Sequence, residues 1–216
     1  MARPCFKIER EFPEPLAGVD EAGCAPLAGP VVAAAVVLDR GRFPRGLDDS
    51  KVLPLRERES LYRRLREQAR IGVGIASVEE IDSLNIYWAR MLAMSRAVEA
   101  LGFDPAFILV DGNACPRWSR PSKAIVGGDG RCRSIAAASV VAKVTRDRMM
   151  IDYCAQYPGY NWSSNKGYPT PDHRRALAEL GPTPLHRRSF APVRQHLLSL
   201  WNENRAGTPE GGRPEV

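Results

Sequence analysis

Two adjacent carboxylates, Asp20 and Glu21, stand between glycines just ahead of the apolar run 31–38. Hard divalent cations prefer oxygen ligands, and Mg²⁺ usually combines one or two carboxylates with a substrate phosphate. Gly23 adds a position at which the backbone can bend and let a ligand come close. The pair therefore suits metal-assisted phosphate chemistry, and it equally suits a solvated turn.

Two further acids follow apolar runs. Asp111 directly follows the run 107–110, and Asp129 follows the run 124–126 and two glycines. The carboxyl ends of strands are where α/β proteins commonly build their sites. If these strands lie side by side, four carboxylates converge, and one of them must stay protonated unless cations neutralise the group. Two divalent ions about 4 Å apart would remove the repulsion and would suit hydrolysis of a phosphodiester.

Asp20 and Glu21 pose a geometric problem, because successive side chains of a strand point to opposite faces. The two acids can share a site only at a bend or at a strand end. Gly23 favours such a bend directly after them.

The elements that must position these acids alternate between strand and helix. Strands are predicted over residues 31–38, 71–76, 107–110 and 124–126. Helices are predicted over residues 55–68, 78–101 with a break near residue 85, 134–156, 171–180 and 192–202. Ser77 begins a capping box, and Asp49 or Ser50 is expected to cap the first helix. The alternation predicts an α/β fold with a mixed central sheet.

A chain of 216 residues forms one domain by default. From composition we expect a flexible N-terminal segment over residues 1–15 and a folded domain over residues 16–204, with a helical C-terminal part from about residue 170. Residues 205–216, rich in Gly, Pro and charge, are expected to be a disordered tail. The sequence shows no sign of an oligomer interface, so a monomer is expected.

The charge balance fits a polyanionic partner, and it equally fits a moderately basic soluble protein without one. Lys and Arg outnumber Asp and Glu by 31 to 25, a net charge of +6, and nucleic acid is the leading candidate. No apolar run approaches the roughly 20 residues of a membrane helix, and no secretory signal is visible. The five cysteines lack any C-x-x-C pair, which argues against a zinc site and fits a cytoplasmic protein.

Short motifs stand in a fixed order between about residues 16 and 195. They are Gly-Val-Asp-Glu-Ala-Gly at 18–23, the Pro-Leu-Ala-Gly-Pro-Val-Val-Ala-Ala-Ala-Val run at 26–36, Asp-Ser-Lys at 49–51, Val-Asp-Gly-Asn at 110–113, Gly-Asp at 128–129, Ser-Ile-Ala-Ala-Ala-Ser at 134–139, Ala-Lys-Val at 142–144, Arg-Asp at 146–147, Gly-Tyr at 167–168 and His-Arg-Arg-Ser-Phe at 186–190. Each motif alone is weak. The ordered set resembles bacterial ribonuclease HII, a type 2 ribonuclease H.

The resemblance implies a ribonuclease H-like fold, with a mixed sheet flanked by helices. It implies a hydrolase, an endonuclease dependent on Mn²⁺ or Mg²⁺, with two ions in the site when substrate is bound. The implied activity is cleavage of the RNA strand of RNA–DNA hybrids and cleavage 5′ of single ribonucleotides embedded in duplex DNA. The products would carry 3′-hydroxyl and 5′-phosphate ends, and the role would be removal of ribonucleotides from DNA.

The resemblance also assigns residues. Asp20, Glu21, Asp111 and Asp129 match the four catalytic, metal-binding acids. Tyr168 matches the tyrosine that stacks on the sugar at the RNA–DNA junction, where a 2′-hydroxyl separates RNA from DNA. Four more positions bind substrate by the same likeness: Lys51 near the scissile phosphate, and the triplet Gly23, Cys24 and Ala25.

One motif departs from the family pattern. Where the family usually has Gly-Arg-Gly, this chain has Gly23-Cys24-Ala25. The missing guanidinium removes a charge-assisted phosphate contact worth about 1.5–3 kcal/mol. If position 25 required a positive φ, its alanine would add about 1 kcal/mol of strain. We therefore expect weaker substrate binding than in relatives with the arginine.

Other polar and aromatic residues favour structural interpretations. Asp147 stands four residues after Lys143, which favours an intrahelical ion pair over a fifth catalytic acid. His173, in the first turn of a predicted helix, is expected at the surface. Trp162 is expected to pack in the interior rather than to join Tyr160 in an aromatic–basic surface. For the segment 186–188 (His-Arg-Arg), phosphate contact and a bracing role are equally open.

Two rival functions remain. The first is a nuclease of the same fold with another nucleic-acid target, such as single strands or junctions. The second is a hybrid-binding protein with weakened or absent catalysis, suggested by Cys24 and Ala25. The intact set of acids speaks against a mere binder, because clustered negative charge facing phosphate would not help binding.

Overall fold

The computed structural model describes residues 3–206, with side chains up to residue 199. Five strands form one mixed sheet in the order β3-β2-β1-β4-β5. The strands are β1 (Leu16–Ala22), β2 (Val31–Leu38), β3 (Ala69–Ala76), β4 (Phe107–Asp111) and β5 (Ser122–Ile125). β2 is antiparallel to both of its neighbours, whereas β1, β4 and β5 are mutually parallel. The α/β fold with a mixed sheet is therefore confirmed.

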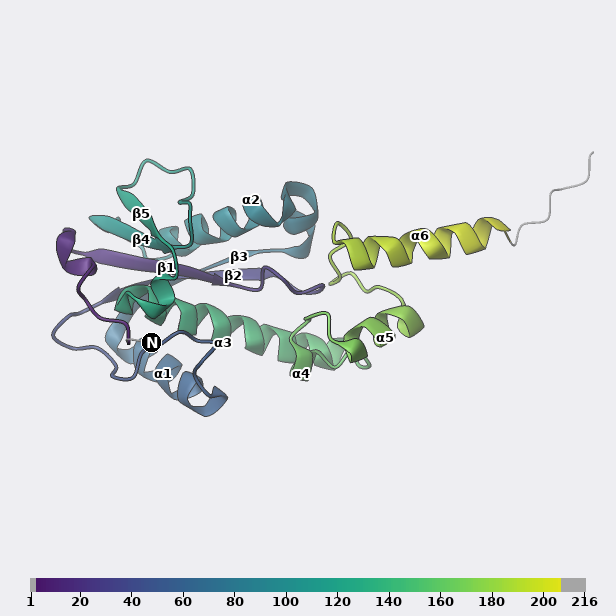
Figure 1. Cartoon of the computed structure of the whole chain (residues 1–216), viewed down its shortest axis with the longest axis horizontal. Helices are drawn as coiled ribbons and strands as arrows, with labels where there is room; N and C mark the ends of the chain where they lie inside the picture. The colour runs from purple at the N-terminus through teal and green to yellow at the C-terminus, as the bar shows by residue number, and fades with distance from the viewer. Residues whose placement is uncertain (1–2, 207–216) are drawn as a thin grey trace, which may run out of the picture.

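Helices cover both faces of the sheet and extend beyond one end of it (Figure 1). They are α1 (Leu55–Gln68), α2 (Val78–Glu99), α3 (Arg133–Gln156), α4 (Trp162–Asn165), α5 (Pro171–Leu180) and α6 (Ala191–Ala206), with 3-10 turns η1 (Glu9–Glu11) and η2 (Gly128–Gly130). α2 packs on one face, and α3 with α1 on the other. No helix within residues 3–206 has both the length and the apolar character needed to span a membrane.

The uninterrupted apolar run of β2 reflects burial on both faces. Val31, Ala33 and Ala35 lie in the core beneath α2, while Ala34 and Val36 lie in the core beneath α3. A strand covered by helices on both sides has no solvent face to mark with polar residues. The uninterrupted apolar pattern of residues 31–38, which is typical of a strand buried on both faces, therefore agrees with the structure.

A glycine brings α3 close to the strand that carries the first two acids. A Cβ atom on Gly18 would lie 2.2 Å from the carbonyl carbon of Ser134, which is too close for any side chain. The first turns of α3 are also rich in alanine, so that helix and sheet approach each other closely. This contact fixes the position of α3 relative to β1.

Most predicted helix ends match the structure, but one cap does not. The Ser77 capping box is present, and the helix after it breaks at Asn85, whose φ is 68°. The prediction that Asp49 or Ser50 caps α1 is wrong, because Pro54 is the N-cap residue and offers no side-chain acceptor. Asp49 instead accepts the backbone N–H of Lys51 in the preceding turn.

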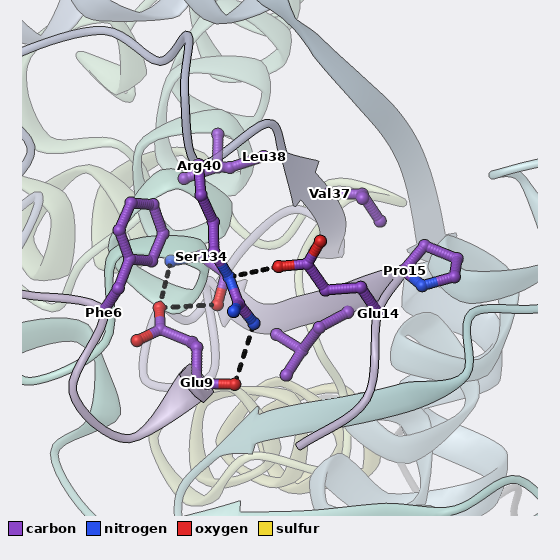
Figure 2. A pocket seen from close by; sticks show the side chains of 9 residues that line it. Phe6, Glu9, Glu14, Pro15, Val37, Leu38, Arg40 and Ser134 are labelled. Carbon is purple, nitrogen blue, oxygen red and sulfur yellow. Dashed lines mark hydrogen bonds and ion pairs between the residues drawn. The ribbon is translucent and has the colours of Figure 1, made fainter. Parts of the chain in front are cut away.

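The segment before β1 packs against the domain. From composition we expected residues 1–15 to be flexible; in the structure Phe6 and Glu9 are buried and η1 forms. Glu9 Oε1 accepts hydrogen bonds from the backbone N and the hydroxyl of Ser134, at 3.0 and 3.1 Å (Figure 2). The predicted tail over residues 205–216 lies outside the described residues, except for its first two, which end α6.

Glu9 therefore caps α3 from a distant part of the chain. The N-cap residue of α3 itself, Cys132, makes no side-chain cap bond. Burial raises the pKa of Glu9 above its usual range, and its second oxygen, Oε2, is buried without a hydrogen-bond partner in the part of the chain that the structure describes. The contact thus combines a useful acceptor with an unfavourable buried charge.

We predict opposite effects for two substitutions of Glu9. Glu9→Ala removes the acceptor and should lower the free energy of unfolding by about 1–2 kcal/mol. Glu9→Gln keeps an acceptor and removes the charge, so it should match or exceed the wild type at pH 8. Because the folded-state pKa of Glu9 is raised, wild-type stability falls as pH rises through that pKa, and the advantage of Gln should shrink at acid pH. Urea unfolding of the wild type and both variants, at pH 8 and at acid pH, measures these free energies of unfolding. Equal stability of Glu9→Ala and the wild type would contradict the prediction.

Candidate active site

Three carboxylates meet at the carboxyl edge of the sheet. Asp20 in β1, Asp111 at the end of β4 and Asp129 in η2 each offer an oxygen, and these oxygens lie within 4.8 Å of one another. β1 and β4 are parallel neighbours, and η2 follows β5, so the topology brings the three acids to one place. The structure thus assembles three of the four predicted acids as an oxygen-rich set.

The fourth acid, Glu21, reaches the same pocket from the other face of the sheet. β1 runs through Glu21 to Ala22, so the predicted bend comes too late to turn Glu21 beside Asp20. Asp20 shares the pocket with Ser139 of α3, whereas Glu21 Oε1 lies 3.4 Å from Arg90 Nη1 of α2. Glu21 is not in the set within 4.8 Å, yet it lines the pocket beside Asp20 and Asp111.

The pocket has a volume of about 240 Å³ and gathers the predicted substrate residues. Besides Asp20, Glu21 and Asp111, the predicted residues that line it are Gly23, Cys24, Ala25, Lys51 and Tyr168. Lys51 Nζ lies 3.4 Å from Asp129 Oδ2, which connects the last acid to the pocket. Sequence reasoning did not identify Ser139 and Lys143 as pocket residues. Their i, i+4 spacing on α3 was the signal available, since it places both on one helix face.

Burial and neighbouring negative charge raise the pKa values of Asp20, Glu21 and Asp111. Burial, followed by the charges of Glu21 and Asp111, raises the pKa of Asp20 well above its usual range. Burial and the neighbouring Asp129 likewise raise the pKa of Asp111. Burial also raises the pKa of Glu21, against the opposing charge of Arg90. Without a cation the group therefore tends to hold protons.

The donor set fits a hard divalent cation. The three clustered acids offer only carboxylate oxygens, which Mg²⁺ and Mn²⁺ prefer. Glu21 Oε2 is buried and has no hydrogen-bond partner among the described residues. A cation would satisfy this oxygen and would also remove the repulsion that raises the pKa values of the acids.

Two buried arginines hold the loop that follows β1. Arg187 donates to the carbonyl oxygens of Gly23 at 2.6 Å and Cys24 at 3.0 Å, and Arg146 donates to Ala28 and Pro30, each at 3.0 Å. Within residues 3–199 neither arginine forms an ion pair. Burial and the charge of Arg146 lower the pKa of Arg187 to about 9. The open question about segment 186–188 thus resolves toward bracing for Arg187.

The Gly-Cys-Ala triplet has an uncharged thiol at its centre. Cys24 Sγ lies 3.5 Å from Glu21 Oε1. Burial and the charge of Glu21 raise the pKa of Cys24 to about 12, so the thiol stays protonated. Gly23 has φ +97°, and Arg146 occupies the space that a Cβ would need there. Ala25 is not among the non-glycine residues with positive φ, so it carries no such strain.

A buried pair of histidines supports the loop that carries Tyr168. The Tyr168 ring is 40% exposed, while its carbonyl oxygen accepts from His173 Nδ1 at 2.9 Å. His173 Nε2 in turn accepts from Trp162 Nε1 at 3.0 Å and lies 3.1 Å from His186 Nε2. Burial lowers the pKa of His173, and burial together with His173 lowers the pKa of His186 to about 3, so both rings are neutral.

These contacts correct one prediction and confirm two others. His173 is not at the surface: it is fully buried, because the first turn of α5 packs on Trp162. Trp162 packs in the interior, as predicted. Asp147 Oδ1 accepts from Lys143 Nζ at 2.7 Å, which is the predicted ion pair.

Comparisons with known proteins agree on one family. The model of the family described as Ribonuclease HII matches residues 17–193. A ribonuclease HII of Rhizorhabdus wittichii is 66% identical over 198 residues, covering 92% of this chain and 98% of that protein. A ribonuclease HII of Parvibaculum lavamentivorans is 57% identical, and the match covers 89% of this chain and 72% of that protein. The crystal structure of ribonuclease H2 from Pyrococcus horikoshii has a TM-score of 0.74 at 26% identity, covering 86% and 98%.

We predict that Asp111→Asn stabilises the metal-free protein at neutral pH. The substitution removes a charge that raises the pKa of both Asp20 and Glu21. Because raised carboxyl pKa values cost stability as pH rises through them, the variant should gain most above pH 7. A gain of about 1 kcal/mol would raise Tm by about 2–4 °C in a chain of this size.

Adding Mn²⁺ should reverse the order. Metal binding to the folded state should raise the Tm of the wild type more than that of Asp111→Asn. The control is Asp147→Asn, which removes an acid already paired with Lys143 and should leave the Mn²⁺ response unchanged. Thermal unfolding in EDTA and in Mn²⁺ measures both effects. A variant less stable than the wild type in EDTA would contradict the electrostatic interpretation.

Proposed function

The chain belongs to the ribonuclease HII family, and we propose that the pocket around Asp20, Glu21, Asp111 and Asp129 is its active site. As a member of this family the protein is a metal-dependent endoribonuclease, a hydrolase that acts on RNA–DNA hybrids. The convergence of three carboxylates beneath the loop of residues 23–25 is the observation that supports the assignment of the site.

We propose that the four acids hold two divalent ions, Mn²⁺ or Mg²⁺, with substrate bound. The mutually close oxygens of Asp20, Asp111 and Asp129, together with Oε2 of Glu21, which has no partner among the described residues, would be the ligands. Such ions supply Lewis-acid stabilisation of the phosphodiester and lower the pKa of the attacking water. The acids therefore have to remain ionised while they are buried, which the cations make possible.

The remaining pocket residues would orient the duplex. Lys51 and Lys143 place two ammonium groups beside the acids, where the scissile phosphate would lie. The exposed ring of Tyr168 would lie against the ribose, where a 2′-hydroxyl distinguishes RNA from DNA. Arg187 donates hydrogen bonds to the carbonyl oxygens of Gly23 and Cys24 and so holds this loop in one conformation toward the substrate.

We propose that cleavage occurs 5′ of single ribonucleotides embedded in duplex DNA, as well as in longer hybrids. The products would carry 3′-hydroxyl and 5′-phosphate ends, and the reaction would begin the removal of ribonucleotides from DNA. A substrate that contains DNA favours a cytoplasmic location, and the convergence of all four acids from one chain favours an active monomer.

The main test is a nicking assay on duplex DNA that carries one ribonucleotide. The wild type with Mn²⁺ or Mg²⁺ should cut directly 5′ of that ribonucleotide, and the all-DNA duplex should stay intact. Asp111→Asn should lose at least about 10²-fold in rate, because it removes a ligand of the ions. Equal cleavage of single strands or junctions would favour the rival nuclease, and binding without cleavage would favour the rival hybrid-binding protein.

A second test concerns Cys24. We predict that Cys24→Arg lowers KM for the duplex, because it adds a charge-assisted phosphate contact worth about 1.5–3 kcal/mol, or about 10-fold or more in affinity. Cys24→Ser, which is similar in size and uncharged, is the matched control and should leave KM near the wild-type value. Steady-state kinetics measures both variants, and an unchanged KM for Cys24→Arg would contradict the prediction.

A further inference from the structure

An aromatic and basic surface lies beside the active site on α2. Its exposed aromatic residues are Tyr87, 44% exposed, and Trp88, 36% exposed. The loop between β4 and β5 faces this part of α2. Between the two lies a groove of about 370 Å³, lined by Trp88, Met91, Leu92, Ser95, Pro116 and Arg117. We call the aromatic and basic residues of this region, Tyr87, Trp88, Arg90 and Arg117, the α2 surface.

Each aromatic ring of the α2 surface carries a guanidinium on its face. The Arg117 guanidinium carbon lies 4.5 Å from the centroid of the Trp88 ring, and that of Arg90 lies 5.6 Å from the Tyr87 ring. A stacked guanidinium keeps its N–H edge free and loses little further conformational freedom when it binds an anion. Such an arrangement suits a bidentate contact with phosphate.

Arg117 has no acidic partner among the described residues. It is exposed and forms neither an ion pair nor a hydrogen bond within residues 3–199. One other stacked arginine differs in this respect: Arg148 lies 4.6 Å from the Tyr62 ring but is paired with Glu59 at 2.6 Å. The charge of Arg117 is therefore available to a ligand from outside the chain.

The α2 surface is continuous with the acid pocket. Arg90, two residues after Trp88, lies 3.4 Å from the carboxylate of Glu21. On the other side, the loop that carries Arg117 leaves β4 directly after Asp111. A polyanion that places one phosphate at the acids would therefore meet the α2 surface as it extends along the protein.

We propose that the α2 surface binds the sugar–phosphate backbone of the duplex substrate beyond the scissile position, with Arg117 on a phosphate and Trp88 as the platform that holds it. The proposal rests on the proposed function, since it takes the substrate to be a nucleic-acid duplex. Bases inside a duplex are already stacked, so the aromatic rings act on the backbone and as supports for the arginines. Phosphate is recognised by the charge and the fork of the guanidinium.

The test measures how binding depends on salt. Each phosphate contact with a duplex contributes about 0.9 to the slope of log affinity against log salt. We expect Arg117→Gln to reduce that slope by about 1 between about 50 and about 200 mM salt. The duplex carries one ribonucleotide and extends about one helical turn, about 10 base pairs, to either side. Fluorescence anisotropy in an Asp111→Asn background measures affinity without cleavage.

Matched variants separate a phosphate contact from a general change of charge. Arg148→Gln removes the same charge from a stacked arginine that is already paired with Glu59, and it should leave the slope at the starting value. Trp88→Ala should weaken binding about three-fold or more, because Arg117 loses its platform, while Trp88→Phe should retain most of the affinity. Circular dichroism confirms that the variants fold.

The possible outcomes can be told apart. A slope reduced by Arg117→Gln and not by Arg148→Gln supports the proposal. The proposal is overturned if Arg117→Gln has the same salt slope as the Asp111→Asn background. It is also overturned if Arg117→Gln and Arg148→Gln reduce the slope equally. If the wild type fails to nick the same duplex, the proposed function fails; if it nicks normally while the Arg117 slope is unchanged, only the proposal about the α2 surface fails.

Discussion

Mutual repulsion among buried carboxylates is the constraint on which the rest of the structure depends. Asp20, Asp111 and Asp129 come from separate elements, and burial together with neighbouring charge raises the pKa of the first two. Left alone, such a cluster would push its elements apart or take up protons. The sheet register and the close contact of α3 at Gly18 hold it together instead. The fold therefore maintains an arrangement that is stable electrostatically only with cations present.

The cleft around this cluster is braced by polar groups that are buried and almost entirely satisfied by neutral partners. Arg146 and Arg187 donate to backbone carbonyl oxygens, and His173 and His186 form a neutral hydrogen-bonded chain to the Tyr168 loop. Carboxylates near these arginines would have competed for the same cations as the acid cluster. Carbonyl dipoles fix the loops without adding negative charge to the cleft, which keeps the anionic groups confined to the metal positions.

Local signals in the sequence predicted the helices and strands. The features that depend on long-range contacts could not be predicted from it. The double-sided burial of β2, the Ser77 cap and the break at Asn85 follow from composition over a few residues. The convergence of acids followed from their places at strand ends. Two features needed tertiary contacts: Glu21 faces Arg90 because β1 continues past it, and His173 is buried because α5 packs on Trp162. Neither contact leaves a periodic signal in one sequence.

The placement of positive charge completes the account of how an acidic cleft can attract a polyanion. The net charge of +6 is distributed so that three of the arginines around the cleft form no ion pair within residues 3–199. Arg146 and Arg187 hold the loop that follows β1, and Arg117 stacks on the Trp88 ring, while Lys51 is paired with Asp129. A phosphate approaching the acids therefore meets a surrounding positive potential before it meets their repulsion. With cations on the acids that repulsion also disappears, so that the same geometry attracts the duplex and then holds its scissile linkage.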